Sequence, residues 1–203
     1  CFYECTALES IDIPNTVTTI EGDAFHNCTS LRSVTIPNSV KTVGASFYGC
    51  SNLSDIKVPD HLYETHIFSG TGITDITVPE GTTAVGSFAD CTKLTSITFP
   101  EGVKALSDFS GCSSLRAIDI PDGVSVIGLG LFEHCTKLTK VTIPSSVVSL
   151  GSFAFHECSS LTHIVIPNHV ATIGGFAFAD CPLTSVTLGS GVTSIEESAF
   201  HNA

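Results

Sequence analysis

The chain has 203 residues, of which 42% are hydrophobic and 14% charged, and 20 acidic residues against 8 Lys and Arg give a net charge of −12. This charge opposes binding to phosphate backbones and to anionic bilayers, so we expect no nucleic-acid partner. The apolar residues are scattered and never approach the ~18 consecutive ones of a membrane-spanning helix, so we expect no membrane insertion.

One sequence unit repeats along the whole chain. It reads Cys-x-x-Leu-x-x-Ile-x-Ile-Pro-x-x-Val-x-x-Ile-Gly, then a variable stretch, then Phe-x-x before the next Cys. A period of 20 to 23 residues predicts a solenoid. We expect a single solenoid of about nine repeats over 1–203 that starts and ends within a repeat, as part of a longer protein. The anchor of the unit recurs at Leu8, Leu31, Leu53, Ile73, Leu94, Leu115, Leu138, Leu161 and Leu183.

The segment that follows each anchor has a constant length. Six residues separate the anchor from a Pro in eight copies and from Gly189 in the ninth, whereas the rest of the unit varies by up to three residues. A segment that must keep its hydrogen-bond register cannot gain or lose residues, so we predict one strand per coil, ended by the Pro. The predicted strands form a parallel sheet and lie within 8–14, 31–37, 53–59, 73–79, 94–100, 115–121, 138–144, 161–167 and 183–189.

The variable arc is expected to return the chain through turns, a twist of 3₁₀ helix or a short strand. Apolar pairs three residues apart, such as Val40 with Val43, fit one such turn. A Gly follows the pair in five copies, and a recurrent Gly predicts a bend with positive φ. These glycines are Gly44, Gly86, Gly128, Gly151 and Gly174.

Two further columns are predicted to form the core. Phe stands three residues before the Cys position in nine copies, from Phe2 to Phe200, and should stack as one spine. Eight Cys, from Cys5 to Cys181, form the second column, with Gly70 at its fourth position. One Cys per coil lacks the paired spacing of a zinc site, so we expect no metal there. Coil spacing alone does not exclude disulfides, but the interrupted column favours free, buried thiols.

The unit Cys-Thr-Ser-Leu-Arg-Ser-Val-Thr-Ile-Pro-Asn-Ser-Val-Lys-Thr-Val-Gly at 28–44 resembles the BspA-like, or Treponema pallidum type, leucine-rich repeat. The resemblance covers essentially the whole chain and implies a right-handed leucine-rich-repeat solenoid. Members of that family are largely surface or secreted proteins, and several are described as adhesins that bind host matrix proteins or other microbes. The resemblance therefore implies a cell-surface or secreted location and a protein partner, and it carries no catalytic motif, metal ligand or cofactor.

The outward positions of the predicted strands are the candidate partner-binding face. Nine strands about 4.8 Å apart would make a face roughly 40 Å long, which suits a protein partner. An equally simple interpretation is that Ser and Thr suit exposed strands. The candidate residues are Asp12, Thr35, Lys57, Thr77, Thr98, Asp119, Thr142, Val165 and Thr187.

A second candidate contact lies in the irregular stretch 60–66, which holds His61, Tyr63, Glu64 and His66. We interpret this stretch as a solvated or partner-contacting arc, because it matches no defined ligand spacing. Elsewhere, His26, His156 and His201 share one position of the unit, and we expect them to be solvated edge residues that lie too far apart to share an ion.

No common enzyme motif occurs, so we expect a non-catalytic, protein-binding module without cofactors. The alternative is a structural protein. Both ends fall inside the repeat without a polar cap, and uncapped solenoid ends can stack into a filament by end-to-end self-association.

Overall fold

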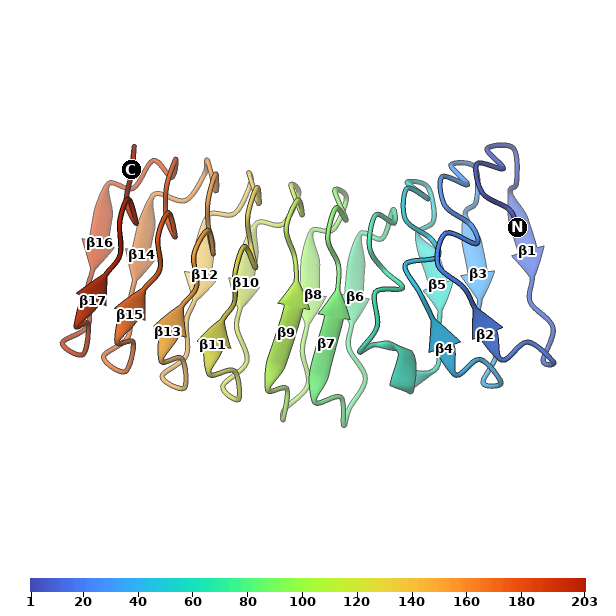
Figure 1. The fold of residues 1–203 in the computed structure, drawn as a ribbon, viewed down its shortest axis with the longest axis horizontal. Coiled ribbons are helices and arrows are strands. Elements are labelled where there is room, and N and C mark those ends of the chain that lie inside the picture. The colour runs from blue at the N-terminus through green and yellow to red at the C-terminus, as the bar shows by residue number, and fades with distance from the viewer.

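The computed structural model describes all 203 residues as one right-handed solenoid of short parallel strands (Figure 1). The N-terminal and C-terminal coils lie at opposite ends of its long axis. Nine three-residue strands follow the nine anchors and make the predicted face, which we call the strand face. They are β1 (Ser10–Asp12), β3 (Ser33–Thr35), β5 (Asp55–Lys57), β6 (Asp75–Thr77), β8 (Ser96–Thr98), β10 (Ala117–Asp119), β12 (Lys140–Thr142), β14 (His163–Val165) and β16 (Ser185–Thr187).

The return arcs carry six strands of two residues, two strands of four residues and one 3₁₀ helix, which together make the return face. As predicted, the arc begins with a turn at the apolar pair and continues as a short strand. The 3₁₀ helix η1 (Asp60–Leu62) replaces the strand in the arc between β5 and β6. The return strands are β2 (Thr19–Ile20), β4 (Thr42–Val43), β7 (Ala84–Ser87), β9 (Ala105–Asp108), β11 (Val126–Ile127), β13 (Ser149–Leu150), β15 (Thr172–Ile173) and β17 (Ser194–Ile195).

All strand pairs are parallel and join equivalent positions of consecutive coils, for example Thr77 with Thr98 and Asp119 with Thr142. The strand face is hydrogen-bonded in four groups, β1-β3-β5, β6-β8, β10-β12 and β14-β16, so the predicted sheet is interrupted. Of 104 backbone hydrogen bonds, 90 lie outside the strands, mostly in turns that repeat from coil to coil. The turns therefore hold the coils together at least as much as the sheet does.

The phenylalanine spine forms as predicted but has one break. Rings stack face to face from Phe2 to Phe47, with centroids 5.2 and 4.9 Å apart, and again from Phe68 to Phe200. The break falls at the coil that carries η1, where the Tyr63 ring leans on Phe68 at 5.1 Å and 49° instead.

The fourth position of the cysteine column is Thr71 and not Gly70, which corrects the sequence-based alignment. Phe68 lies three residues before Thr71, as in every other coil, and Thr71 Oγ1 lies 3.7 Å from Cys91 Sγ. Gly70 has φ +67 and takes the preceding position, where the backbone is left-handed in every coil, as at Asn27 and Asp90. The missing residue falls between Thr71 and Ile73, so the column is unbroken.

All nine cysteines are free thiols, and seven of the eight column members are buried. The Sγ atom of each buried Cys donates to the carbonyl oxygen of the spine phenylalanine in the preceding coil at 3.0 to 3.2 Å, from Cys28 to Cys181. Cys5, in the first of the described coils, is exposed, so the expectation of a buried thiol is wrong there.

The prediction of positive φ at the recurrent glycines is also wrong. Positive φ occurs at other glycines, none of them among the five predicted. At four of the five, all except Gly128, the role is steric: a Cβ atom on Gly151, for example, would lie 2.7 Å from the Gly128 carbonyl carbon of the preceding coil. Glycine therefore allows two backbones to approach closely at this corner.

The protein contains no helix with the length and apolar character needed to cross a lipid bilayer.

Candidate binding surface

The nine candidate residues of the strand face are all exposed and stand in one row along the solenoid. They occupy the third position of each strand, while the central residue of each strand points toward the core. Register pairs bring neighbours of the row side by side, Asp12 with Thr35, Thr35 with Lys57, and Val165 with Thr187. The strand face is thus a regular surface on which every second side chain of a strand is available to a partner.

The chemistry of this row is mixed and mostly polar. Thr142 Oγ1 donates to Asp119 Oδ1 at 2.5 Å. No carboxylate lies within 4.0 Å of Lys57 Nζ, so its charge is free. Val165 is 63% exposed and places an apolar side chain in the polar row. Hydroxyl, carboxylate, ammonium and aliphatic groups therefore face solvent together.

The middle of the strand face is hollowed and acidic. A depression of about 710 Å³ extends from β8 to β12 along the turns that follow these strands. Its lining includes Thr98, Asp119 and Thr142 of the row together with Glu101 and Asp122 of the turns. A second depression of about 390 Å³ surrounds Asp12, Thr35 and Lys57. Three carboxylates in the central hollow make it attractive to a cationic group.

The irregular stretch 60–66 does not join this surface, because it lies in the return arc between β5 and β6 (Figure 1). His61 Nε2 lies 2.9 Å from the Val40 carbonyl oxygen, and Glu64 Oε1 accepts a long hydrogen bond of 3.5 Å from Thr83 Oγ1. Tyr63 is half-buried, and burial followed by the charge of Asp60 raises the pKa of its phenol. His66 is exposed. The four candidate residues are thus separate contacts on the return side.

Two other groups of side chains occupy the corner that follows the spine phenylalanine, and the sequence analysis did not find them. The rings of Tyr3, His26 and Tyr48 stack across three consecutive coils with centroids 5.0 and 5.5 Å apart. Tyr3 is 54% exposed. This gives the protein an exposed aromatic patch at the corner between the return arcs and the following strands, of the type that anchors protein contacts. Aligning the position after each spine phenylalanine over consecutive coils would have revealed the patch.

The second group lies at the same corner, near the C-terminal end. Glu133, His134 and His156 have ligand atoms within 4.8 Å of one another. The side chains of His156 and His26 are only 18% and 22% exposed, so the expectation of solvated edge residues is wrong for these two, whereas His201 is exposed. The sequence analysis compared only histidines of one position, whereas His134 occupies the next position of the preceding coil.

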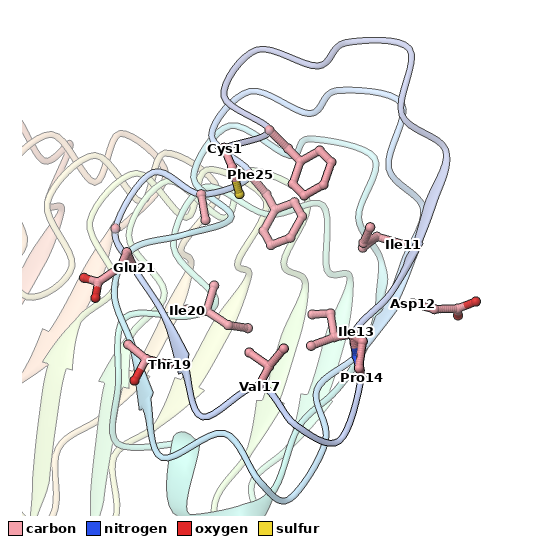
Figure 2. Close-up of a pocket in the computed structure, with 13 residues that line it drawn as sticks. Cys1, Ile11, Asp12, Ile13, Pro14, Val17, Thr19, Ile20, Glu21 and Phe25 are labelled. Carbon is pink, nitrogen blue, oxygen red and sulfur yellow. The ribbon is translucent and has the colours of Figure 1, made fainter.

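The N-terminal end of the solenoid is open and apolar (Figure 2). A hollow of about 550 Å³ lies there, and its lining includes Phe2, Ile11, Ile13, Val17 and Phe25. Phe25, Ile20 and Val17 point into it from the first coils. Side chains that other coils bury against a preceding coil are thus accessible at this end.

Comparisons with known proteins agree with this architecture. The family model of the BspA type leucine rich repeat region, with six copies, matches residues 1–88 and 86–203. A leucine-rich repeat protein from Bacteroides ovatus is 30% identical over 99% of this chain with a TM-score of 0.79, and this chain spans 66% of its length. The T. pallidum leucine rich repeat protein is 31% identical over 71% of this chain and 72% of its own, with a TM-score of 0.61.

A more distant structure shares the fold alone. The pneumococcal vaccine antigen PcpA is 17% identical over 91% of this chain and 58% of its own length, with a TM-score of 0.59. No match is found among the curated proteins.

Proposed function

The chain belongs to the BspA-type leucine-rich repeat family, and on that premise we propose that it binds a protein partner through the strand face, without catalysis. The partner is a host matrix protein or a microbial surface protein, and the chain acts as part of a cell-surface or secreted adhesin. The surface location rests on the family resemblance and on the description of the distant neighbour PcpA as a vaccine antigen.

The observation that carries this proposal is the exposed, in-register row of the strand face with its acidic central hollow. Leucine-rich repeats present an extended surface on which many modest contacts add up. Glu101, Asp119 and Asp122 surround the central hollow, and the chain carries a net charge of −12. A partner segment that carries Lys or Arg complements this charge, and association should be faster at low ionic strength.

The test replaces Thr77, Thr98 and Asp119 together with Arg. The three positions are exposed, so the fold should be kept, while the charge of the acidic region is reversed. Binding is measured by surface plasmon resonance against immobilised extracellular-matrix proteins and against purified microbial surface proteins. We expect the triple variant to lose at least tenfold in affinity for the protein that the parent binds, because like charges then oppose each other.

A matched control places three Arg on the return face of the same part of the solenoid, at Ala105, Ser107 and Ser125, which are also exposed. The three added Arg make this control less negative than the parent, as in the strand-face variant, but leave the strand face intact. If the control loses as much affinity as the strand-face variant, or if the strand-face variant binds like the parent, the strand face is not the binding site.

The open apolar end favours one second candidate, end-to-end self-association of this chain. The hollow that Phe2, Ile13 and Val17 line could take up the last coil of another copy, which would continue the solenoid by a heterologous contact. Light scattering should then show a mass that rises with concentration, and Val17→Glu should restore the monomer. A parent chain that stays monomeric at every concentration contradicts this candidate.

A further inference from the structure

Two imidazoles and three carboxylates meet at the corner of three consecutive coils, on a part of the surface that the proposed function does not use. Glu133 and His134 follow Phe132, His156 and Glu157 follow Phe155, and Asp180 follows Phe178 at the equivalent position. Hydrogen bonds between coils fix the backbone at this corner: His134 N donates to the His156 carbonyl oxygen at 2.8 Å, and Glu157 N donates to the Ala179 carbonyl oxygen at 2.9 Å.

We propose that Glu133, His134 and His156 form a binding site for a divalent transition-metal ion of the zinc class. Glu133 Oε1 lies 2.9 Å from His156 Nδ1 and 3.7 Å from His134 Nε2. Ligands bound to zinc at about 2.0 to 2.2 Å in a tetrahedron lie roughly 3.3 Å apart. The two distances to Glu133 bracket this value, and the ligand atoms of all three residues lie within 4.8 Å of one another, so side-chain rotations can bring all three onto one ion.

The remaining two carboxylates occupy the positions that a metal site of this kind uses for support. A histidine that binds a metal through one ring nitrogen generally donates its other N–H to a carboxylate. The second nitrogen of His134, Nδ1, lies 3.0 Å from Glu157 Oε2. The second nitrogen of His156, Nε2, lies 3.5 Å from Asp180 Oδ2. Both rings are thus oriented with one nitrogen toward Glu133 and the other toward a carboxylate acceptor.

Charge and packing favour an ion at this point. With both imidazoles neutral, Glu133, Glu157 and Asp180 bring three negative charges together, which a divalent cation largely offsets. The Phe153 ring lies edge-on to His156 at 5.4 Å and 81°, and limits the rotation of that ring. The His134 side chain is 49% exposed, so an ion can enter from solvent and keep water or a partner's side chain as its fourth ligand.

The ligand set distinguishes among metals. Two imidazole nitrogens and one carboxylate oxygen suit zinc, nickel or copper, whereas calcium and magnesium require oxygen ligands throughout. The ligands come from two coils, Glu157 comes from the second of these, and Asp180 comes from a third, so a bound ion would link three consecutive coils. Binding only to the folded chain then stabilises it in proportion to the logarithm of the metal concentration.

The test is a titration of the whole chain with Zn²⁺ in isothermal calorimetry, followed by the same titration of variants. His134→Asn keeps the left-handed backbone, because Asn27 occupies the equivalent position at φ 57 against φ 58 for His134. His156→Ala has its precedent in Ala179, one coil further on. We expect one ion per parent chain, a loss of at least tenfold in affinity for each variant, and a loss of about tenfold for Glu157→Gln.

The matched control is His169→Asn, which removes an exposed histidine in the turn after β14 and should bind Zn²⁺ like the parent. Circular dichroism and thermal melting of each variant without metal check that the fold is kept. If the parent takes up no ion, or if the His134 and His156 variants bind as tightly as the control, the proposal fails.

Thiols are the competing ligands, so all proteins in this test also carry Cys1→Ser and Cys5→Ser, which remove the two exposed thiols. Co²⁺ then replaces Zn²⁺ as a spectroscopic probe. We expect visible ligand-field bands that disappear in the His134 and His156 variants, without the intense ultraviolet charge-transfer band of a thiolate ligand. A thiolate band would assign the ion to the cysteine column and overturn the proposal.

Discussion

Tyr48 and Asp90 are joined by a hydrogen bond that crosses an entire coil, with Tyr48 Oη donating to Asp90 Oδ2 at 2.5 Å. Gly70 lies between them, and a Cβ atom there would come within 2.9 Å of the Tyr48 ring and 2.7 Å of the Gly49 nitrogen. The bare backbone of Gly70 therefore lets the ring lie across its coil. This hydrogen bond to the Asp90 carboxylate, together with partial burial, raises the pKa of the Tyr48 phenol.

Replacing Asp90 with Asn should lower the pKa of Tyr48 toward its ordinary value of about 10, because the charged acceptor is lost. The pKa is measured by ultraviolet titration of the tyrosinate in a chain with Tyr3→Phe and Tyr63→Phe, where Tyr48 is the one remaining tyrosine. Asp119→Asn, on the strand face, serves as the control and should leave the titration unchanged. An unaltered pKa in the Asp90 variant would mean that burial alone causes the shift.

Alkaline pH should destabilise the protein through its buried thiols. Burial raises the pKa of Cys91 from 9.0 to about 11 and that of Cys135 to about 12. The unfolded chain therefore loses its thiol protons first, so this stabilising contribution is intact below about pH 9 and is lost as pH rises through 11. A shift of two units at Cys91 alone corresponds to about 3 kcal/mol.

Urea unfolding at pH 8 and pH 11 measures this loss. Cys91→Thr should reduce the pH dependence, since Thr71 already occupies the same column position one coil earlier without a titrating group. Cys1→Ser removes an exposed thiol and should leave the pH dependence as in the parent. If the free energy of unfolding falls as much between pH 8 and pH 11 in the Cys91 variant as in the parent, other groups control alkaline unfolding.

Two glycines at equivalent corners should respond in opposite ways to replacement by Ala. A Cβ on Gly128 meets no atom within 4 Å, whereas one on Gly151 lies 2.7 Å from the backbone of the preceding coil. Neither residue has positive φ. Gly128→Ala should therefore be neutral or raise the free energy of unfolding by up to about 1 kcal/mol, and Gly151→Ala should lower it by about 1 to 3 kcal/mol.

Thermal and urea unfolding of the two variants compare them directly. Gly128 follows β11 and Gly151 follows β13, so both lie in interior coils with a neighbouring coil on each side. Equal destabilisation by both replacements would mean that the corner requires glycine for backbone flexibility and not for close approach.

The fold could be predicted because every coil of a solenoid uses the same strand, turn and core positions, so the sequence pattern recurs with the structure. The constant distance from Leu31 to Pro37 and its equivalents located all nine strands, and the Phe positions located the spine. The alignment failed at Gly70 because it placed the cysteine-column position three residues before the anchor Ile73, as in most coils. In this coil one residue is missing between the column position and the anchor. Local hydrogen bonds, such as that from Thr71 Oγ1 to the Phe68 carbonyl oxygen at 2.5 Å, identify the column position, and they require coordinates.

The surface could be predicted only in part, for a physical reason. Alternation along a strand makes every second side chain face outward, so the exposure of Thr77 and Thr98 follows from the pattern. His134 and His156 lie close together although they occupy different positions of the repeat in neighbouring coils. Comparing residues at one position of the repeat therefore does not find this pair. The reach of Tyr48 across a whole coil to Asp90 likewise depends on the missing side chain at Gly70.

The last prediction concerns the spine. Phe132 is fully buried, and its ring stacks on Phe109 at 5.7 Å and on Phe155 at 5.4 Å, so Phe132→Ala should cost about 3 to 5 kcal/mol. Phe176 loses the same atoms on replacement by Ala, but it is only half-buried, stacks face to face on Phe153 alone and meets His201 edge-on at 6.4 Å. Its replacement should cost less than half as much.

Because each coil contacts only its neighbours, the cavity left by Phe132 lies between the two halves of the stack and weakens their coupling. We therefore expect Phe132→Ala also to broaden the urea transition, and hydrogen exchange to show coils on either side opening separately. Phe176→Ala should keep one cooperative transition. If both variants unfold in a single sharp step with equal losses of free energy, the coils are coupled by their turn hydrogen bonds and not by the stacked rings.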